Sequence, residues 1–590
     1  MDKPAVRRFS INASSEGIFV TACSLAFAVL FSLPLLEHLT DGFFVDDWDY
    51  FRDHDWSDLR TVTYFHQFPL WSPYQCGGMQ ALASPQSRML SPFFLLHLIA
   101  GSTVGINLEI PLHLAIAWAG GYVLARSLDF GKFAAVGCAT VFPSSSWFYL
   151  HLGVGQLDFV AFTYSPWIVA FTLIAIERKG ISWAAAAGLT LALAFFEGGV
   201  HPVAQTVVLL MMLAVIAAAM QRDHWPLTIL VAVGLFALGF GAVKLLPTLF
   251  LAIQYSRPTS ADQYLSLGAC LASLFSREQA WYRTLQWLDV GSMSFTESGT
   301  YLSPAFLIMA LAGVWAAPRR SLPWILMALA FLVLGTGSRF GPYSPWVLVH
   351  RLPIFSWLRI PPRYFVLLPL CVAVLTGFGV EWMNGWKPPF GVLLAIVLLA
   401  SGTIDTWLIC PQNLFVGSTA AEPAIPKSPV FRQFNGPNQQ MFSVNNADMG
   451  ISNCYNGLMV PLGFVTASNQ PGYKGEEYLL GPGVLQLSRW TPNVLDYDVE
   501  VKSPTIMVVN ENYDSPWTLI QGRGEVFSYN GLLAVRLPAG RQRLELAYRS
   551  YPFLAGIVIF CLTMLVVLVI MRLEYVSGEL LPARWPPRRP

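Results

Sequence analysis

Long apolar runs constrain this chain more than any other feature of its sequence. Windows of about 20 residues with few charges are long enough to cross the hydrocarbon core of a bilayer as helices. Such windows lie near residues 17–36, 104–125, 133–150, 158–177, 181–199, 203–220, 226–252, 300–316, 322–337, 363–383, 388–408 and 551–572. Only 12% of the 590 residues are charged, about half the share in a soluble protein. The sequence therefore predicts an all-α polytopic membrane protein with about twelve transmembrane helices.

Basic residues predict how these spans are oriented. Short cytoplasmic loops of membrane proteins carry an excess of Lys and Arg. The N-terminal segment contains Lys3, Arg7 and Arg8, and the first span lacks the small-residue cleavage site of a signal peptide. If the N-terminus is cytoplasmic, every short inner loop and the C-terminal tail are basic, with Arg126 and Lys132, Arg178 and Lys179, Arg222, Arg319 and Arg320, Lys387, and Arg572, Arg584, Arg588 and Arg589. We therefore expect both termini in the cytoplasm.

The opposite, outer face then receives the long polar segments. These are residues 37–103, 151–158, 197–202, 253–299, 337–363 and 410–550. In the last of them, "TIMVVNENY", "LLAVRLPAG" and "RLELAYRS" alternate apolar and polar residues, which predicts strands. We expect a membrane domain at 1–409, an extracytoplasmic β-rich domain of the sandwich type at 410–550, and a last transmembrane helix with a basic tail at 551–590. The convergence of polar segments predicts a single site on the outer face.

The stretch "DGFFVDDWDYFRDHDW", residues 41–56, places several carboxylates just beyond the outer end of the first span. A carboxylate there can accept a proton from a hydroxyl or bind a divalent cation. The alternative is solvation of a helix end at the interface. If the segment is extended, Asp47 and Asp49 share a side, whereas in a helix Asp46 and Asp49 share a face.

Several motifs resemble, in the same order along the chain, those of a known family. They are "PLWSPYQCGGMQALASPQS" in the first outer loop, then "EGGVHPVAQT", "VKLLPTLFLAIQYSR", "FTESGTYLSP" and "LPIFSWLRIPPRYFVLLPL", and finally "VNENYDSPW", "LPAG" and "LELAYRS". These segments are similar to those of the bacterial membrane protein YfhO family, and the resemblance covers residues 40–560. The sequence departs from the family's pattern at Ser72, Ser303, Val200 and Val203-Ala204, which bears on the substrate more than on the fold.

This resemblance implies a C-type (GT-C) membrane glycosyltransferase fold. Such enzymes use a polyprenyl-phosphate sugar donor on the outer side of the bacterial inner membrane, and an acid of the first outer loop usually serves as the base. We therefore expect Asp47 to be the base, with Asp46 as the second choice and Asp49 as a helper that orients it. Asp46 and Asp49 are also the candidate ligands of a divalent cation, Mg²⁺ or Mn²⁺.

A leaving phosphate requires cations nearby. Lys244 is the sharpest candidate because an ammonium inside a span is costly, although its side chain could instead snorkel to the interface. The other expected donor-phosphate ligands are Arg257, Arg339, Arg359 and Arg363, with lipid headgroup contact or a loop salt bridge as the alternative for the last two. The expected substrate-binding residues, at outer span ends and in the first loop, are Gln86, Glu197, His201 and Glu297.

The sequence thus predicts sugar transfer from a polyprenyl-phosphate donor to a cell-envelope acceptor, which can be a glycan, a lipid or a protein. Two rival classes are a transporter or flippase of lipid-linked glycans and a scaffold for envelope assembly. A net charge of +1 gives no indication of a nucleic-acid partner. The eight cysteines contain no CxxC and predict neither a metal site nor a disulfide scaffold, although a Cys410–Cys454 disulfide is one alternative.

Overall fold

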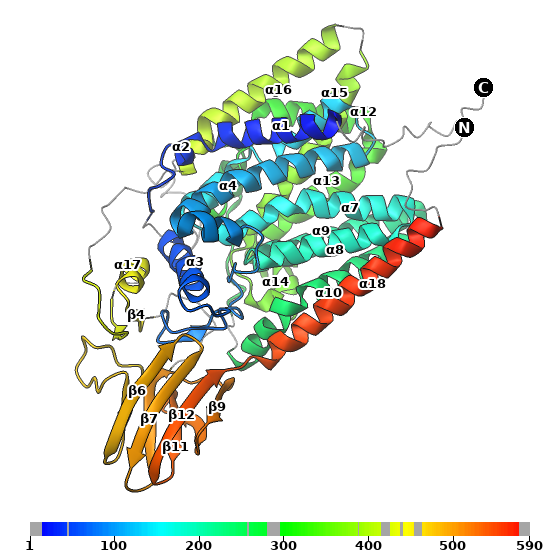
Figure 1. Ribbon diagram of the computed structural model, residues 1–590. Coiled ribbons are helices and arrows are strands. Elements are labelled where there is room, and N and C mark those ends of the chain that lie inside the picture. Colours follow the sequence, from blue (N-terminus) through cyan, green and yellow to red (C-terminus); the bar gives the residue numbers. More distant parts are fainter. Residues whose placement is uncertain are drawn as a thin grey trace.

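The chain forms a helical membrane domain with a β-sandwich at one end (Figure 1). The computed structural model describes residues 15–43, 47–255, 259–279, 295–386, 389–414, 425–436, 440–453 and 463–577. Within these ranges eight helical segments are long and apolar enough to cross a membrane: α4 (Phe94–Ser127), η1 (Leu157–Tyr164) with α7 (Ser165–Arg178), α9 (Val200–Gln221), α10 (Trp225–Gln254), α13 (Pro318–Gly335), η6 (Pro361–Val366) with α15 (Leu367–Asn384), α16 (Phe390–Ile409) with η7 (Pro411–Leu414), and α18 (Tyr551–Val576). Three shorter apolar helices accompany them: α1 (Ser15–Phe31), α8 (Ile181–Phe196) and α12 (Pro304–Ala316).

These helices correspond to eleven of the expected spans. The exception is residues 133–150, where α5 (Lys132–Val141) and α6 (Ser146–Gly153) are separate helices. Pro143 stands between them and lacks the N–H that a continuous helix would need. The serines that follow it favour helix starts over helix interiors. This region therefore forms two short helices rather than one continuous span.

The long helices run side by side, and polar elements gather at one end of them (Figure 1). Helix α3 (Asp47–Thr63) and the sandwich lie at that end, whereas the first described residue of α1 and the last of α18 lie at the other. The short elements between the long helices are α2 (Leu33–Leu36), α11 (Leu267–Phe275), η3 (Phe295–Glu297), η4 (Ser338–Tyr343), α14 (Pro345–His350), η5 (Phe355–Trp357) and α17 (Met441–Asn446).

The expected β-rich region contains a sandwich of two four-stranded antiparallel sheets. One sheet has the order β10-β11-β8-β5 and the other β6-β7-β12-β9. The strands are β5 (Glu477–Leu479), β6 (Gly483–Thr491), β7 (Val494–Val501), β8 (Thr505–Asn512), β9 (Trp517–Gln521), β10 (Glu525–Tyr529), β11 (Leu532–Leu537) and β12 (Gly540–Tyr548). Alternate residues such as Tyr497 and Val499 on β7, and Leu533 and Val535 on β11, form its buried core, as the alternation in the sequence predicts.

The first outer loop joins the sandwich to the membrane domain. Short strands β1 (Trp71–Ser72) and β2 (Met79–Gln80) pair within this loop, and β3 (Gln433–Phe434) pairs with β4 (Gly450–Ile451). The Trp71 side chain is fully buried in the sandwich core, where its ring packs edge-on against Trp517. Its Nε1–H donates to Glu511 at 3.0 Å. A residue more than 400 positions away in the sequence therefore completes the core of the sandwich.

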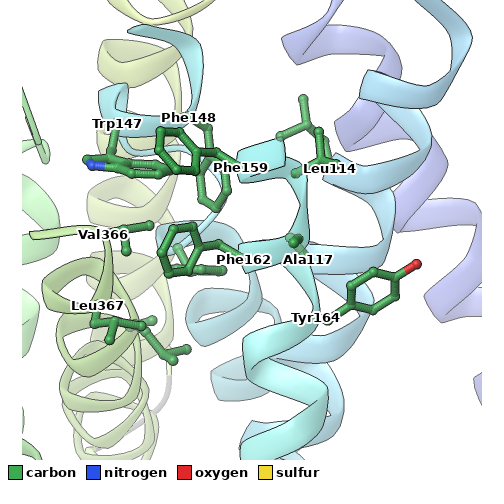
Figure 2. Packing of buried hydrophobic residues seen from close by; sticks show 14 of the residues in the cluster. Leu114, Ala117, Trp147, Phe148, Phe159, Phe162, Tyr164, Val366 and Leu367 are labelled. Atoms are coloured by element: carbon green, nitrogen blue, oxygen red, sulfur yellow. The ribbon is translucent and has the colours of Figure 1, made fainter. Parts of the chain in front are cut away.

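Aromatic side chains pack the membrane domain tightly near its polar end (Figure 2). Trp147 of α6 lies edge-on to Phe162 of η1, with ring centroids 5.1 Å apart, and 5.4 Å from Phe159. Val366 of η6 belongs to the same cluster. Because interiors pack as densely as organic crystals, these contacts fix α6, η1 and η6 relative to one another, and the site described below is built from the same segments.

The cysteines correct one expectation. Cys410 is a buried free thiol, so a Cys410–Cys454 disulfide is not formed. Cys76, in the first outer loop, is disulfide-bonded instead.

Candidate active site

Helix α3 begins at Asp47, which settles the local geometry of the acidic stretch. Two hydrogen bonds fix this start: the Asp47 N–H donates to the Val154 carbonyl at 3.1 Å, and Trp48 Nε1 donates to the Gly153 carbonyl at 3.0 Å. Gly155 has a φ of +86°, and a Cβ there would lie 2.2 Å from the backbone nitrogen of Trp48. The turn after α6 thus requires glycine and places Asp47 in the first turn of α3.

An arginine–glutamate pair lies next to this helix start. Arg363 of η6 donates from Nε and from one terminal nitrogen to the two carboxylate oxygens of Glu297, each at 2.8 Å. Its other terminal nitrogen lies 3.1 Å from His201 Nε2, which must accept because guanidinium nitrogens only donate. Gln156 also donates to Glu297 at 3.1 Å. Three of the expected site residues, from three distant segments, therefore meet in one hydrogen-bonded group.

Electrostatics connect this group to the acids of the outer loop. Arg363 interacts with Asp158 and Asp47 as well as with Glu297, and Asp158 is hydrogen-bonded by Gln86. Burial would raise the pKa of Glu297, but the Arg363 guanidinium outweighs it and holds that pKa well below the usual range. Glu297 is consequently ionised, and both of its carboxylate oxygens accept hydrogen bonds. Asp47 is only partly buried, so it is the more accessible carboxylate of the two.

Arg359 lies two residues before the first proline of η6 and is exposed. Its charge interacts electrostatically with those of Arg363, Glu297 and Asp47. Among the described residues no carboxylate forms an ion pair with Arg359. It is thus a cation available at the edge of the site. Arg339 is exposed on η4, and Asp46 and Arg257 lie outside the described residues.

Asp49 and Asp53 face away from this group, toward α17. Asp49 is fully buried and accepts hydrogen bonds from the backbone N–H groups of Met441, at 2.7 Å, and Phe442, at 3.3 Å. Asp53, one turn further along α3, accepts from the side-chain amides of Gln75 and Asn445. Burial raises the pKa of Asp53 to about 7. Asp49 thus holds the first turn of α17, which is a structural task.

Lys244 has partners other than the expected phosphate. Its ammonium is completely buried and donates to the carbonyls of Pro85 at 3.0 Å, Ser87 at 2.7 Å and Phe195 at 2.7 Å. An ammonium has three N–H donors, so these bonds use all of them. In this structure Lys244 therefore joins the first outer loop to the end of α8.

A second group of ionisable side chains lies deeper between α3, α4 and α8. Arg88 forms an ion pair with Glu109 of α4, and its guanidinium lies 3.7 Å from Asp55. Glu197, expected to bind substrate, belongs to this group rather than to the first: its carboxylate accepts from Tyr164 at 3.2 Å and lies 3.8 Å from His113. All six side chains are buried.

Sequence reasoning did not single out His113, Asp158 or Asp53 as site residues. For His113 a signal existed, because Glu109 and His113 are four residues apart in an apolar run, where ionisable residues are rare and functional. Asp158 and Asp53 had no such signal. Each is one acid among several in a polar segment, and only its burial distinguishes it.

A cavity of about 630 Å³ lies in the outer part of the molecule, between the sandwich and residues 430–432. Its wall includes the stacked rings of Phe431 and Trp490, 4.5 Å apart, and the carboxyl groups of Glu476 and Glu511. Burial raises the pKa of Glu476 to about 7 and that of Glu511 to about 8. The cavity is lined by residues of the β-rich region and is separate from the Arg363 group.

Comparison with known proteins places the chain only loosely. No model of a known protein family matches it, and no curated protein matches it. Among solved structures, it is similar to a cryo-EM structure of the arabinofuranosyltransferase AftD from mycobacteria, with 15% identity and a TM-score of 0.48 over 75% of this chain and 32% of that chain. A mutant form of AftD gives 15% identity and a TM-score of 0.43, over 71% and 29%. The chain thus spans about a third of the length of AftD, and a likeness at this level identifies neither a family nor an activity.

Proposed function

We propose that the protein is a membrane glycosyltransferase that moves a sugar from a polyprenyl-phosphate donor to a hydroxyl of an envelope acceptor. The observation that carries this proposal is the position of Asp47. It is a partly exposed carboxylate in the first turn of α3, beside Arg359 and Arg363. A base next to cations is the arrangement that transfer from a phosphate leaving group needs.

In this proposal Asp47 takes the proton of the acceptor hydroxyl. The acceptor oxygen then bonds to the anomeric carbon, the bond from that carbon to the phosphate oxygen breaks, and the phosphate leaves on the polyprenyl chain. Arg359 meets the negative charge on the phosphate because its guanidinium is exposed, whereas Arg363 already donates to Glu297 and His201. Arg363 and Glu297 position the turn that carries Arg359.

Sidedness supports the same proposal. Disulfides persist in oxidising compartments and are rare in the bacterial cytosol, and Cys76 of the first outer loop is disulfide-bonded. The sandwich and α3 lie at the end of the bundle opposite the start of α1 and the end of α18 (Figure 1). Together with the basic inner loops, this favours an extracytoplasmic site in a bacterial inner membrane.

Purified protein should release sugar from one member of a panel of polyprenyl-phosphate sugars. Removal of a general base costs roughly 10²–10⁴-fold in rate, so Asp47→Asn should lower turnover at least about a hundredfold while donor binding persists. Asp41→Asn is the matched control, because Asp41 pairs with His38 at 2.7 Å at the other end of the same loop. Near-normal turnover of Asp47→Asn would exclude Asp47 as the base, and no release from any donor would favour the transporter or scaffold alternatives.

A further inference from the structure

Three buried side chains between α4 and α8 converge like ligands of a metal ion. Glu109 and His113 lie one turn apart on α4, and Glu197 follows the last residue of α8. One ligand atom from each lies within 4.8 Å of the other two. His113 Nε2 is 3.4 Å from Glu109 Oε1 and 3.8 Å from Glu197 Oε1. Ligand atoms bound about 2.1 Å from a tetrahedral ion lie about 3.4 Å apart, which is close to these separations.

The hydrogen bonds of His113 fix which ring nitrogen faces the carboxylates without a proton. Its Nδ1 lies 2.8 Å from Thr163 Oγ1, and that hydroxyl donates its only hydrogen to the Val160 carbonyl at 2.6 Å. Thr163 must therefore accept, so Nδ1 carries a hydrogen. In the neutral imidazole the lone pair on Nε2 then points at two carboxylates. This is the arrangement in which histidine binds metals, with the other ring nitrogen held by a hydrogen bond.

A second observation also points to a ligand. His113 Nε2 and Glu109 Oε1 are buried without a hydrogen-bond partner among the described residues, and the two side chains are each 1% exposed or less. A lone pair facing an ionised carboxylate at 3.4 Å is unfavourable in a buried site. Either a cation lies between the atoms, or His113 carries a second proton.

The charges of the surrounding group favour a divalent cation. Four buried carboxylates, Asp55, Asp58, Glu109 and Glu197, face two cations, Arg88 and Lys244. Asp158 also interacts with both cations, so buried carboxylates outnumber the cations of this group, and a bound cation would offset the excess. The histidines that adjoin these acids are His54, His97 and His113, and their protonation would offset the same charge.

We propose that Glu109, His113 and Glu197 bind one zinc ion that joins α4 to the end of α8. Imidazole nitrogen and carboxylate oxygen are both zinc ligands, and three protein ligands leave a fourth position for water or substrate. The remaining partners fit around this ion: Tyr164 donates to Glu197 Oε1, and Arg88 binds the other oxygen of Glu109. The site is separate from the Asp47 group and does not depend on the proposed glycosyl transfer.

The test is metal content of the full-length protein, purified in detergent without added metal and again after zinc loading and desalting. We expect one zinc per chain by elemental analysis and a higher thermal unfolding temperature with zinc than after chelation. His113→Gln and Glu197→Gln should retain less than a tenth of the zinc. His54→Gln is the matched control, since His54 is equally buried and adjoins Asp58 at 3.6 Å but is not a ligand.

Thr163→Val tests the proposal without removing a ligand. Valine has nearly the shape of threonine but cannot accept the Nδ1 hydrogen, and loss of such a supporting bond typically costs 10–100-fold in metal affinity. Zinc affinity should therefore fall by about this factor while the protein stays folded. Absence of zinc from the loaded wild-type protein, or equal zinc in wild type and in His113→Gln, would overturn the proposal and leave a protonated His113 between the two carboxylates.

Discussion

The protonation of Asp53 should control how firmly α17 is held against α3. Asp53 is completely buried and accepts hydrogen bonds from Gln75, at 2.6 Å, and from Asn445 of α17. Asp53→Asn removes the charge and keeps the shape. The new amide can still accept from Gln75, and a flipped Asn445 can accept from it, because Asn445 Oδ1 is buried without a partner among the described residues.

The magnitude follows from the pKa of this carboxyl. Burial raises that pKa from 3.8 to about 7, with the neighbouring charge of Asp49 adding to it and the two amide hydrogen bonds opposing it. The folded protein then binds the proton more tightly than the unfolded chain. The stabilisation is complete below pH 4 and is lost as the pH rises to about 7. Its full size is about 4 kcal/mol, since each tenfold change in proton affinity corresponds to 1.36 kcal/mol.

Hydrogen exchange of the α17 amides is the direct assay. At pH 8, exchange through opening of α17 from α3 should be slower in Asp53→Asn than in wild type, by up to about a thousandfold if opening exposes residue 53 to water. At pH 5 the difference should shrink to roughly 10–20-fold, because the folded carboxyl is then mostly neutral but the carboxyl exposed on opening, with its ordinary pKa of 3.8, still ionises. Strands β11 and β12, which do not contact Asp53, serve as the internal control. The same ratio of exchange rates at both pH values would refute the reasoning.

Three further outcomes are expected. Lys244→Met should lower the thermal unfolding temperature, because it leaves three buried carbonyls without hydrogen-bond donors, at a cost of about 1–3 kcal/mol each. Unchanged stability together with weaker binding of the sugar donor would instead indicate that Lys244 binds the donor phosphate. Trp71→Ala should destabilise the sandwich by about 3–5 kcal/mol in denaturant unfolding, and Trp71→Phe by less, since it mainly loses the bond to Glu511. A cysteine at the exposed Lys474 should react with an impermeant thiol reagent from outside intact spheroplasts, and one at the exposed Arg319 should not; labelling of both would contradict the topology.

Local sequence patterns were sufficient for the architecture. A transmembrane helix satisfies its own backbone hydrogen bonds and requires only a sufficient apolar length. Apolar length alone therefore predicts the helices α4, α9, α10, α15 and α18. Strand alternation in the C-terminal region identified the sandwich in the same way, because a period of two residues follows from the pleat. The expectation of one helix at 133–150 was wrong. A hydropathy window does not take into account that Pro143 interrupts the backbone hydrogen bonds of a helix.

Tertiary structure decided which of the expected residues lie together in one group. Glu197 and His201 are four residues apart, yet the break between α8 and α9 sends Glu197 to His113 and Glu109, and His201 to Arg363. Lys244 and Arg363 were both expected to bind the donor phosphate, but packing surrounds Lys244 with carbonyls and pairs Arg363 with Glu297. The role of an ionisable side chain depends on the groups within about 4 Å of it. Those groups come from other helices, and no local sequence pattern encodes how these helices pack.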